Sequence, residues 1–197
     1  MDLAATVFSS GWASGVNAYA TVLVLSLLGR SGTVGVPEQL ESDPVLIASA
    51  VLFAIEFVTD KIPYVDTAWD SIHTVIRPLI GSALGFTFTG DAGVSTFEEA
   101  VGGGGAGVTA LASHGIKAGL RLGINTSPEP VSNIVASLGE DSAVVMVTYF
   151  AIENPELAAL MAFVLLVAGT VLVVLLWKSI RAAWGRFRAW RRRSRGP

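Results

Sequence analysis

The sequence contains no cysteine and only two histidines, and charged residues make up just 15% of it. The lack of cysteine excludes disulfide bonds and thiolate chemistry. Hydrophobic residues, by contrast, account for 52% of the 197 residues. Because soluble domains carry about 25% charged residues, this composition is typical of an integral membrane protein.

The few charges are unevenly distributed along the chain. All 16 acidic residues lie before residue 157, whereas eight of the 13 basic residues follow residue 177. The body therefore has five basic against 16 acidic residues, a net charge of −11, and the tail has a charge of +8. The first 15 residues include no basic one, so we expect an uncleaved first helix and not a signal peptide.

Six apolar stretches are long enough to cross a hydrocarbon core of about 30 Å, which takes about 20 residues. They cover residues 11–29, 44–62, 66–88, 100–124, 130–152 and 155–177. The third stretch is the weakest because its first half is polar, and a half-buried or re-entrant helix is an alternative there. The predicted fold class is all-α: a polytopic domain over residues 1–177 with about six transmembrane helices, followed by a basic amphipathic helix over 178–197.

The basic residues also predict an orientation, because they concentrate on the cytoplasmic side of membrane proteins. The basic tail should be cytoplasmic, and six crossings return the N-terminus to the same side. The outer loops would then be 30–43, 89–99 and 151–154, which contain seven acidic residues against Arg30 alone. We therefore expect a multi-pass protein of the cell membrane with both termini inside.

Polar side chains recur at helical spacing inside the apolar stretches. Intervals of three and four residues place side chains on one face of a helix. Four sets follow this pattern: Asp66, Asp70, His73 and Arg77; His114, Lys117, Arg121 and Asn125; Asn133, Ser137 and Glu140; Glu56 and Asp60. Charges in lipid are costly unless they are paired or hydrated, so we expect these stripes to face one another across the bundle.

The stripes predict a polar, charged vestibule toward the cytoplasmic ends of the helices. Its candidate solute-binding residues are Asn17, Glu56, Asp60, Lys61, Asp66, Asp70, His73, Arg77, His114, Lys117, Arg121, Asn125, Glu129, Asn133, Glu140 and Asp141. The alternative is that the helix over 66–88 lies flat on the cytoplasmic surface with its charges in water, while Lys117 and Arg121 only reach toward the interface.

Several blocks of the sequence together resemble a known family. They read GWASGVNAYATVL, EFVTDKIPYVDTAWDSIHTVIRP, ASHGIKAGLRLGINTSPEPVSN and SLGED. They are similar to the bacterial integral-membrane family known as domain of unknown function 4126, over residues 11 to about 170. The resemblance implies a multi-pass protein of the bacterial inner membrane and brings no activity with it.

Two other motifs suggest chemistry only weakly. The glycine run 102–105 satisfies a phosphate-cradling template, but no strand precedes it, so close helix packing is favoured and a re-entrant kink comes second. Asp70 and His73, completed by His114 and Glu140, have the residue types of a helical metal site. With only two histidines in the chain, we expect no metal and no cofactor.

The tail has its own pattern. Trp177, Ile180, Trp184 and Phe187 recur at intervals of three and four, with basic residues around them. This is typical of a helix that lies in the membrane interface and binds anionic lipid, here through Lys178, Arg181, Trp184 and Arg188. Nucleic-acid binding is disfavoured because the aromatic residues adjoin a membrane span.

These patterns favour a protein that binds or translocates a small polar or charged solute, or a lipid headgroup, in the vestibule. One alternative is a membrane-embedded enzyme acting on a lipid headgroup, with His73 or His114 as acid and base. The other is a non-catalytic scaffold whose charges only fix helix packing. The expected partners are membrane lipids and the solute, and a homo-oligomer is compatible with the sequence.

Overall fold

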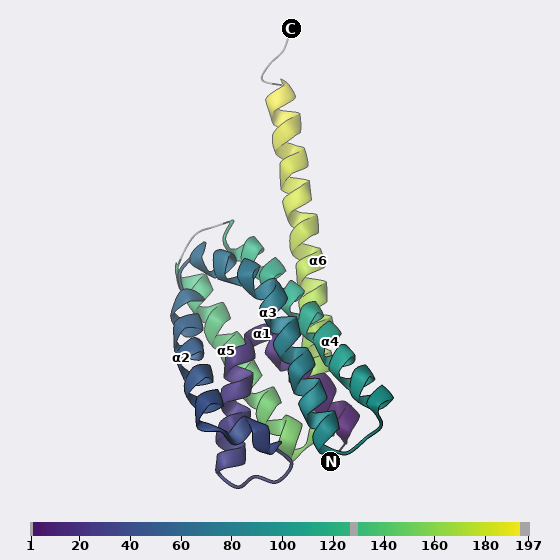
Figure 1. The fold of residues 1–197 in the computed structure, drawn as a ribbon. Coiled ribbons are helices and arrows are strands. Elements are labelled where there is room, and N and C mark those ends of the chain that lie inside the picture. The colour runs from purple at the N-terminus through teal and green to yellow at the C-terminus, as the bar shows by residue number, and fades with distance from the viewer. Residues whose placement is uncertain (1, 127–129, 194–197) are drawn as a thin grey trace.

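The computed structural model describes residues 2–126 and 130–193, and these ranges contain helices and no strand. The all-α class is confirmed. The elements are α1 (Leu3–Arg30), the short 3-10 helix η1 (Glu38–Glu41), α2 (Asp43–Thr59), α3 (Val65–Asp91), α4 (Thr96–Ile124), α5 (Pro130–Glu153) and α6 (Pro155–Arg193). Helices α1 to α5 form a bundle, and α6 packs along one side and extends far beyond it (Figure 1).

Local sequence explains where the helices begin. Asp2 caps α1 by accepting a hydrogen bond from the Ala5 amide at 3.2 Å. Ser95 and Glu98 form a reciprocal capping box at the start of α4. Helices α5 and α6 begin with proline. Proline lacks an N–H group, and this costs nothing in the first turn because N–H groups there have no acceptor within the helix. The remaining proline of interest, Pro78, lies inside α3 without ending it.

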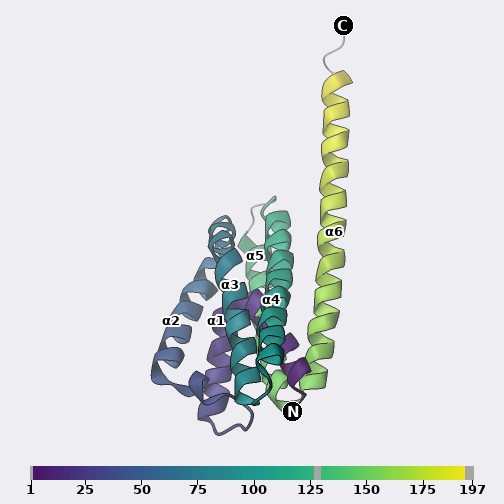
Figure 2. The same cartoon turned by 45° about the vertical axis from the view of Figure 1, so that its right-hand side comes forward.

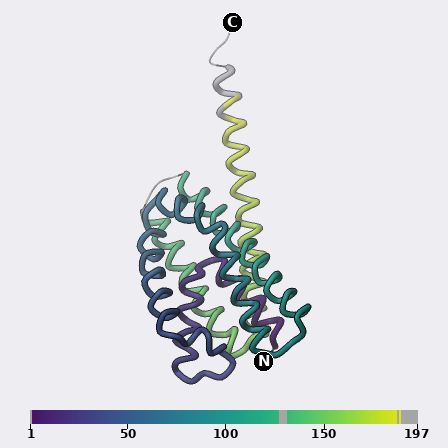
Figure 3. Tube along the Cα trace, viewed as in Figure 1, coloured from purple at the N-terminus to yellow at the C-terminus, as the bar shows by residue number. Residues whose placement is uncertain are grey.

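Helix α1 is broken in its middle and folds back on itself. At Asn17 the backbone leaves the helical conformation (φ −150°, ψ 97°). Val7 and Leu25 lie on opposite sides of the break, yet both belong to one hydrophobic cluster with Phe88 and Ile152. A straight helix would hold Val7 and Leu25 about 27 Å apart. The two halves, 3–16 and 18–30, therefore form a hairpin that turns at Asn17, and the trace folds back on itself (Figure 3).

The break changes the predicted topology. Both ends of α1 lie at the same end of the bundle, and α2 to α6 then run in alternating directions (Figures 1 and 2). The described chain consequently begins at one end of the bundle and finishes beyond the other. This differs from the straight first helix that the sequence predicts, whereas the stretch 66–88 forms one continuous helix.

Small residues bring α1 and α3 close to α4. A Cβ atom on Gly11 would lie 2.7 Å from the carbonyl oxygen of Ala106, and one on Gly85 would lie 2.6 Å from that of Gly102. Cβ atoms do not tolerate such distances, so these positions need glycine. Within the glycine run, Gly102 and Gly103 face Thr89 and Phe86 of α3. The predicted role of these two glycines in helix packing is confirmed.

Within the residues that the structure describes, three helices are long and apolar enough to cross a membrane by length and composition: Leu3–Arg30, Val131–Glu153 and Pro155–Arg186. They differ in burial. The most apolar window of α1 is 72% buried inside the protein, whereas that of α6 is only 11% buried. A helix with apolar residues exposed all round is suited to lipid and not to water. The central position of α1 explains why most of its residues from Thr6 to Thr21 are buried.

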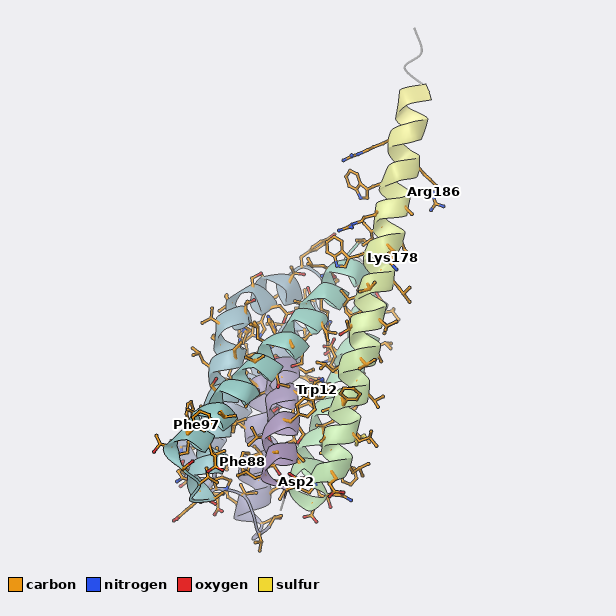
Figure 4. The ribbon with its side chains drawn as sticks, turned by 90° about the vertical axis from the view of Figure 1, so that its right-hand side faces the viewer. Asp2, Trp12, Phe88, Phe97, Lys178 and Arg186 are labelled. Carbon is orange, nitrogen blue, oxygen red and sulfur yellow. The ribbon has the colours of Figure 1, made fainter. Side chains whose placement is uncertain are left out.

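The tail does not form a separate helix in the described residues. Helix α6 runs without a break from Pro155 to Arg193, so residues 178–193 continue the last apolar helix away from the bundle (Figure 4). This differs from the separate interfacial helix that the sequence predicts. The helix continues because residues 178–193 contain no proline and are mostly strong helix formers. The single glycine, Gly185, does not break it.

The re-entrant α1 predicts a specific labelling pattern. Single cysteines at Asp2 and Glu98 should react with a membrane-impermeant maleimide from the same side of the membrane, because both residues lie at the same end of the bundle (Figure 4 labels Asp2 and Phe97). A cysteine at Arg186 should react only from the opposite side. Labelling of Asp2 and Arg186 from one side would show that α1 crosses completely.

Candidate functional site

The break in α1 leaves backbone carbonyl groups without their helical partners, and cations of two other helices occupy them. Lys117 of α4 donates a hydrogen bond to the carbonyl oxygen of Val16 at 3.1 Å, and Arg77 of α3 donates one to Gly15 at 3.4 Å. Asn17 caps the second half of α1, since its Oδ1 accepts from the Ala20 amide at 2.9 Å. The tip of the hairpin is thus held by charged side chains.

The same cations join a buried ionic network. Arg77 pairs with Glu56 of α2 at 2.6 Å and lies 3.1 Å from Asp70. Lys117 pairs with Asp60 at 2.6 Å and lies within 3.6 Å of both Glu56 and Glu140. The side chains of Arg77 and Glu56 have no exposed surface.

Arg121 continues the network toward the end of the bundle that holds the α2–α3 turn. It pairs with Glu140 of α5 at 2.6 Å and lies 3.8 Å from both Asp60 and Asp66. Asp66 also accepts a hydrogen bond from Asn125 at 2.9 Å, and Asn133 donates to Asn125 at 3.1 Å. Three cations therefore connect carboxylates from α2, α3, α5 and the turn between α2 and α3.

Asp141 of α5 connects the network with the tip of the hairpin. Its Oδ1 accepts a hydrogen bond from the Asn17 side chain at 3.1 Å, and Lys61 lies 3.9 Å from its Oδ2. Lys61 also donates to Ser137 at 3.1 Å. The Asp141 carboxylate thus sits beside the N-terminal end of the second half-helix, where the helix dipole favours negative charge.

Hydrogen bonds fix the tautomers of both histidines. Arg77 Nη1 lies 2.7 Å from His114 Nδ1 and can only donate, so this Nδ1 carries a lone pair. The proton of His114 is then on Nε2, 3.1 Å from the Thr74 hydroxyl. His73 Nδ1 donates to the Trp69 carbonyl at 2.8 Å, and its Nε2 accepts from the Tyr19 hydroxyl at 2.9 Å. The His114 ring is therefore neutral, and a neutral His73 ring fits its two partners.

The network contains more negative than positive charge. Its members among the described residues are six carboxylates (Glu56, Asp60, Asp66, Asp70, Glu140 and Asp141) and four cations (Lys61, Arg77, Lys117 and Arg121), which leaves a net charge of −2 with neutral histidines. Asp70 is the least satisfied member: it is 2% exposed, and neither of its oxygens accepts a hydrogen bond within the described part of the chain.

The structure brings together the candidate residues that it describes. The members of the predicted set from Asn17 to Asp141 belong to the network or contact a member of it, with two exceptions: His73 binds Tyr19 and the Trp69 carbonyl, and Glu129 lies outside the described residues. The alternative of a helix lying flat in water is wrong, because Asp66, Asp70, His73 and Arg77 are each at most 2% exposed. The residues form a packed network and not an open vestibule.

The predicted set lacks several participants, among them the carbonyl groups of Gly15 and Val16 and the hydroxyl of Tyr19. Backbone carbonyls carry no residue-type signal, and an apolar helix with one tyrosine gives no sign of an ionic partner. The helical metal site is not assembled either. Among the residues described, no group of three or more potential ligands could hold a metal ion, and both histidines are engaged by protein groups.

The predicted lipid-binding residues lie elsewhere. Lys178, Arg181, Trp184 and Arg188 are all exposed on the part of α6 that extends beyond the bundle. None of them contacts the ionic network, so the tail is a separate feature of the molecule.

Comparison with known protein families matches residues 4–177 to the family described as Domain of unknown function (DUF4126). The chain belongs to this family. The match covers the whole bundle and the apolar part of α6, and confirms the resemblance seen in the sequence. No curated protein and no solved structure matches. The DUF4126 description names no activity, so the function has to be argued from the network itself.

The buried network predicts a large difference between two arginines. Arg77→Ala should lower the free energy of unfolding by about 3–5 kcal/mol, because Glu56 and Asp70 would remain buried without their cation. Arg30→Ala is the matched control: Arg30 pairs with Asp43 at the same 2.6 Å, but both side chains are exposed, and the loss should be at most about 1 kcal/mol.

Denaturant unfolding of the purified protein in one detergent measures both. Equal losses for the two variants would contradict the energetic importance of the network.

Proposed function

We propose that this DUF4126 protein is a multi-pass membrane protein that binds and translocates a small polar or charged solute at the ionic network. In this proposal α2 to α6 cross the membrane and α1 enters and leaves from one side. Helices α2, α3 and α4 have 17, 27 and 29 residues, enough to span, and the latter two carry network charges that lower their hydropathy. The protein would lie in the bacterial inner membrane.

The observation that carries the proposal is the broken helix at the centre of the charge network. Non-helical backbone deep in a membrane protein is tolerated only where protein or a water-filled cavity surrounds it. Secondary transporters use such discontinuous helices to bind their substrates, with half-helix ends and free carbonyls as ligands. Here the carbonyl groups of Gly15 and Val16 are released from the helix and accept hydrogen bonds from Arg77 and Lys117, and Asn17 and Asp141 lie at the opposite half-helix end.

The orientation follows from the loops. The loops at the α1 end are acidic, and the basic tail leaves from the other end. We therefore assign the end with the α2–α3 turn and the tail to the cytoplasm. This keeps the predicted cytoplasmic C-terminus and moves the N-terminus to the outside.

The enzymatic alternative is less well supported. A hydrolytic site needs a nucleophile beside a base. The Ser113 hydroxyl instead donates to the carbonyl oxygen of Trp12 at 2.9 Å, and the ring nitrogens of His73 and His114 face protein partners. The scaffold alternative predicts no solute flux and is separated by experiment.

Flux in proteoliposomes tests the proposal. Because the network has a net negative charge, the panel should consist of Na⁺, K⁺, protons, choline and ethanolamine. We expect the wild-type protein to carry at least one of them above protein-free liposomes. Asp141→Asn, which keeps an acceptor for Asn17 but removes the charge beside the break, should lower that flux at least about tenfold, in line with a lost charge-assisted contact.

Asp43→Asn is the control, since Asp43 is exposed and lies outside the network. Its flux should match that of the wild type. Flux indistinguishable from protein-free liposomes for the whole panel would favour the scaffold.

The basic part of α6 is proposed to bind anionic lipid at the cytoplasmic surface. Each Lys or Arg near an anionic leaflet contributes about 1 kcal/mol, and the tail has eight such residues. Truncation after Lys178 should leave a folded, inserted protein that co-purifies with less phosphatidylglycerol and cardiolipin. Unchanged lipid in mass spectra of the truncated protein would contradict this role.

A further inference from the structure

A cavity of about 230 Å³ lies between the ionic network and α6. It is formed where four helices meet: α1, α4, α5 and α6. Helices α4 and α5 barely touch one another, and α6 packs against both. Figure 4 shows Trp12, one wall of this cavity, facing α6 from the bundle. Helix α6 therefore covers a gap through which the network approaches the outer surface of the bundle.

The cavity has one charged end and apolar walls. Lys117 and Glu140 of the network border it, whereas the rest of its lining is mainly apolar, with Trp12, Ile116 and Leu172 among the larger side chains. A cavity of 150 Å³ lined by apolar groups stays dry and holds a benzene molecule. The larger space here suits an alkyl chain or a ring, and its charged end suits a polar head.

Glu140 is the network member best placed to meet that head. Its side chain is 18% exposed, compared with 2% for Lys117. Its Oε2 binds Arg121, and its Oε1 accepts no hydrogen bond within the described residues. Lys117, by contrast, already contacts three carboxylates and a carbonyl oxygen.

The sign of the head follows from the charge of the network. Six carboxylates against four cations leave two negative charges that no described side chain compensates. An anionic head at Glu140 would add to this excess, whereas an ammonium head would reduce it and form a charge-assisted hydrogen bond with the free oxygen.

We infer that this cavity is a binding site for a cationic amphiphile, an alkylammonium compound that enters from the lipid side beneath α6 and places its head at Glu140. The inference rests on the proposed function in treating the network as a ligand site. It goes further by naming the substrate class and the route of entry: the apolar part occupies the space between Trp12 and α6, and the head reaches the network without crossing the bundle from either end.

Quenching of Trp12 fluorescence tests binding without requiring flux. The probe is an alkyltrimethylammonium compound brominated on its chain, added to the purified protein in nanodiscs of zwitterionic lipid; a brominated alkyl sulfate of the same length is the comparison. We expect saturable quenching by the ammonium compound and none by the sulfate. The saturable part should disappear in Trp12→Phe, which assigns it to this cavity among the five tryptophans.

Two variants separate the head from the chain. Glu140→Gln should weaken binding about tenfold or more, since it removes the charge at the head. Ala143→Leu should weaken it by filling the cavity, whereas Ala112→Leu, on the exposed face of α4 outside the lining, should not. If Glu140→Gln fails to fold, the comparison of the ammonium and sulfate probes still tests the preference for a cationic head. Ala143→Leu still tests the position of the chain in the cavity.

Equal quenching by both head groups, or binding unaffected by Glu140→Gln in a folded protein, would overturn the inference. Saturable binding without flux of any solute would keep the site and contradict the proposed translocation. Flux without saturable quenching would support the proposed translocation and contradict this binding site.

Discussion

The cost of burying charge governs this structure. Three cations on α3 and α4 lie in the interior of an apolar bundle, and each must face carboxylates because an unpaired buried charge costs several kcal/mol. Arg77, Lys117 and Arg121 satisfy this requirement only if α2, α3, α4 and α5 are all in place. The pairs therefore fix the rotation of four helices about their axes. In lipid, where apolar side chains gain little from contacting one another, such polar contacts specify which faces meet.

The broken α1 completes this arrangement. A continuous helix would engage its own carbonyl groups, whereas the break at Asn17 turns those of Gly15 and Val16 toward Arg77 and Lys117. The approach is close because Gly15 packs directly on Ala110 and Ser113 of α4. The half-helices thus contribute packing on one side and polar groups at the tip. At the same tip Asn17 donates to Asp141, and Tyr19 forms a hydrogen bond with His73. A change in the conformation of the network would therefore alter contacts of α1.

Much of the network was predictable from spacing alone. The intervals of three and four residues that join Asp66 to Arg77 and His114 to Asn125 specify two helix faces, and the cost of charge in lipid specifies that the faces meet. The helix ends were also predictable from proline, glycine and capping residues.

The break in α1 was not predictable from the sequence. The segment GVNAY has the composition of an ordinary apolar helix, and Pro78, the stronger helix-breaking signal, does not interrupt α3. The proposed position of the N-terminus differs from the predicted one for the same reason, because a fold-back in the first helix changes the proposed number of crossings by one. The continuation of α6 as one helix follows from the helix formers of its tail, which the amphipathic spacing alone does not distinguish from a separate interfacial helix.

The distance between spin labels at Ala4 and Leu27 tests the broken helix most directly. Both residues are exposed, and they lie in the two different halves of α1. A continuous helix would separate their Cα atoms by about 35 Å. The re-entrant hairpin predicts a much shorter distance, because both halves end on the same side of the bundle (Figure 3). Pulsed electron paramagnetic resonance on the protein in nanodiscs distinguishes the two: a short distance supports the site described above, and a distribution centred near the straight-helix value would contradict it.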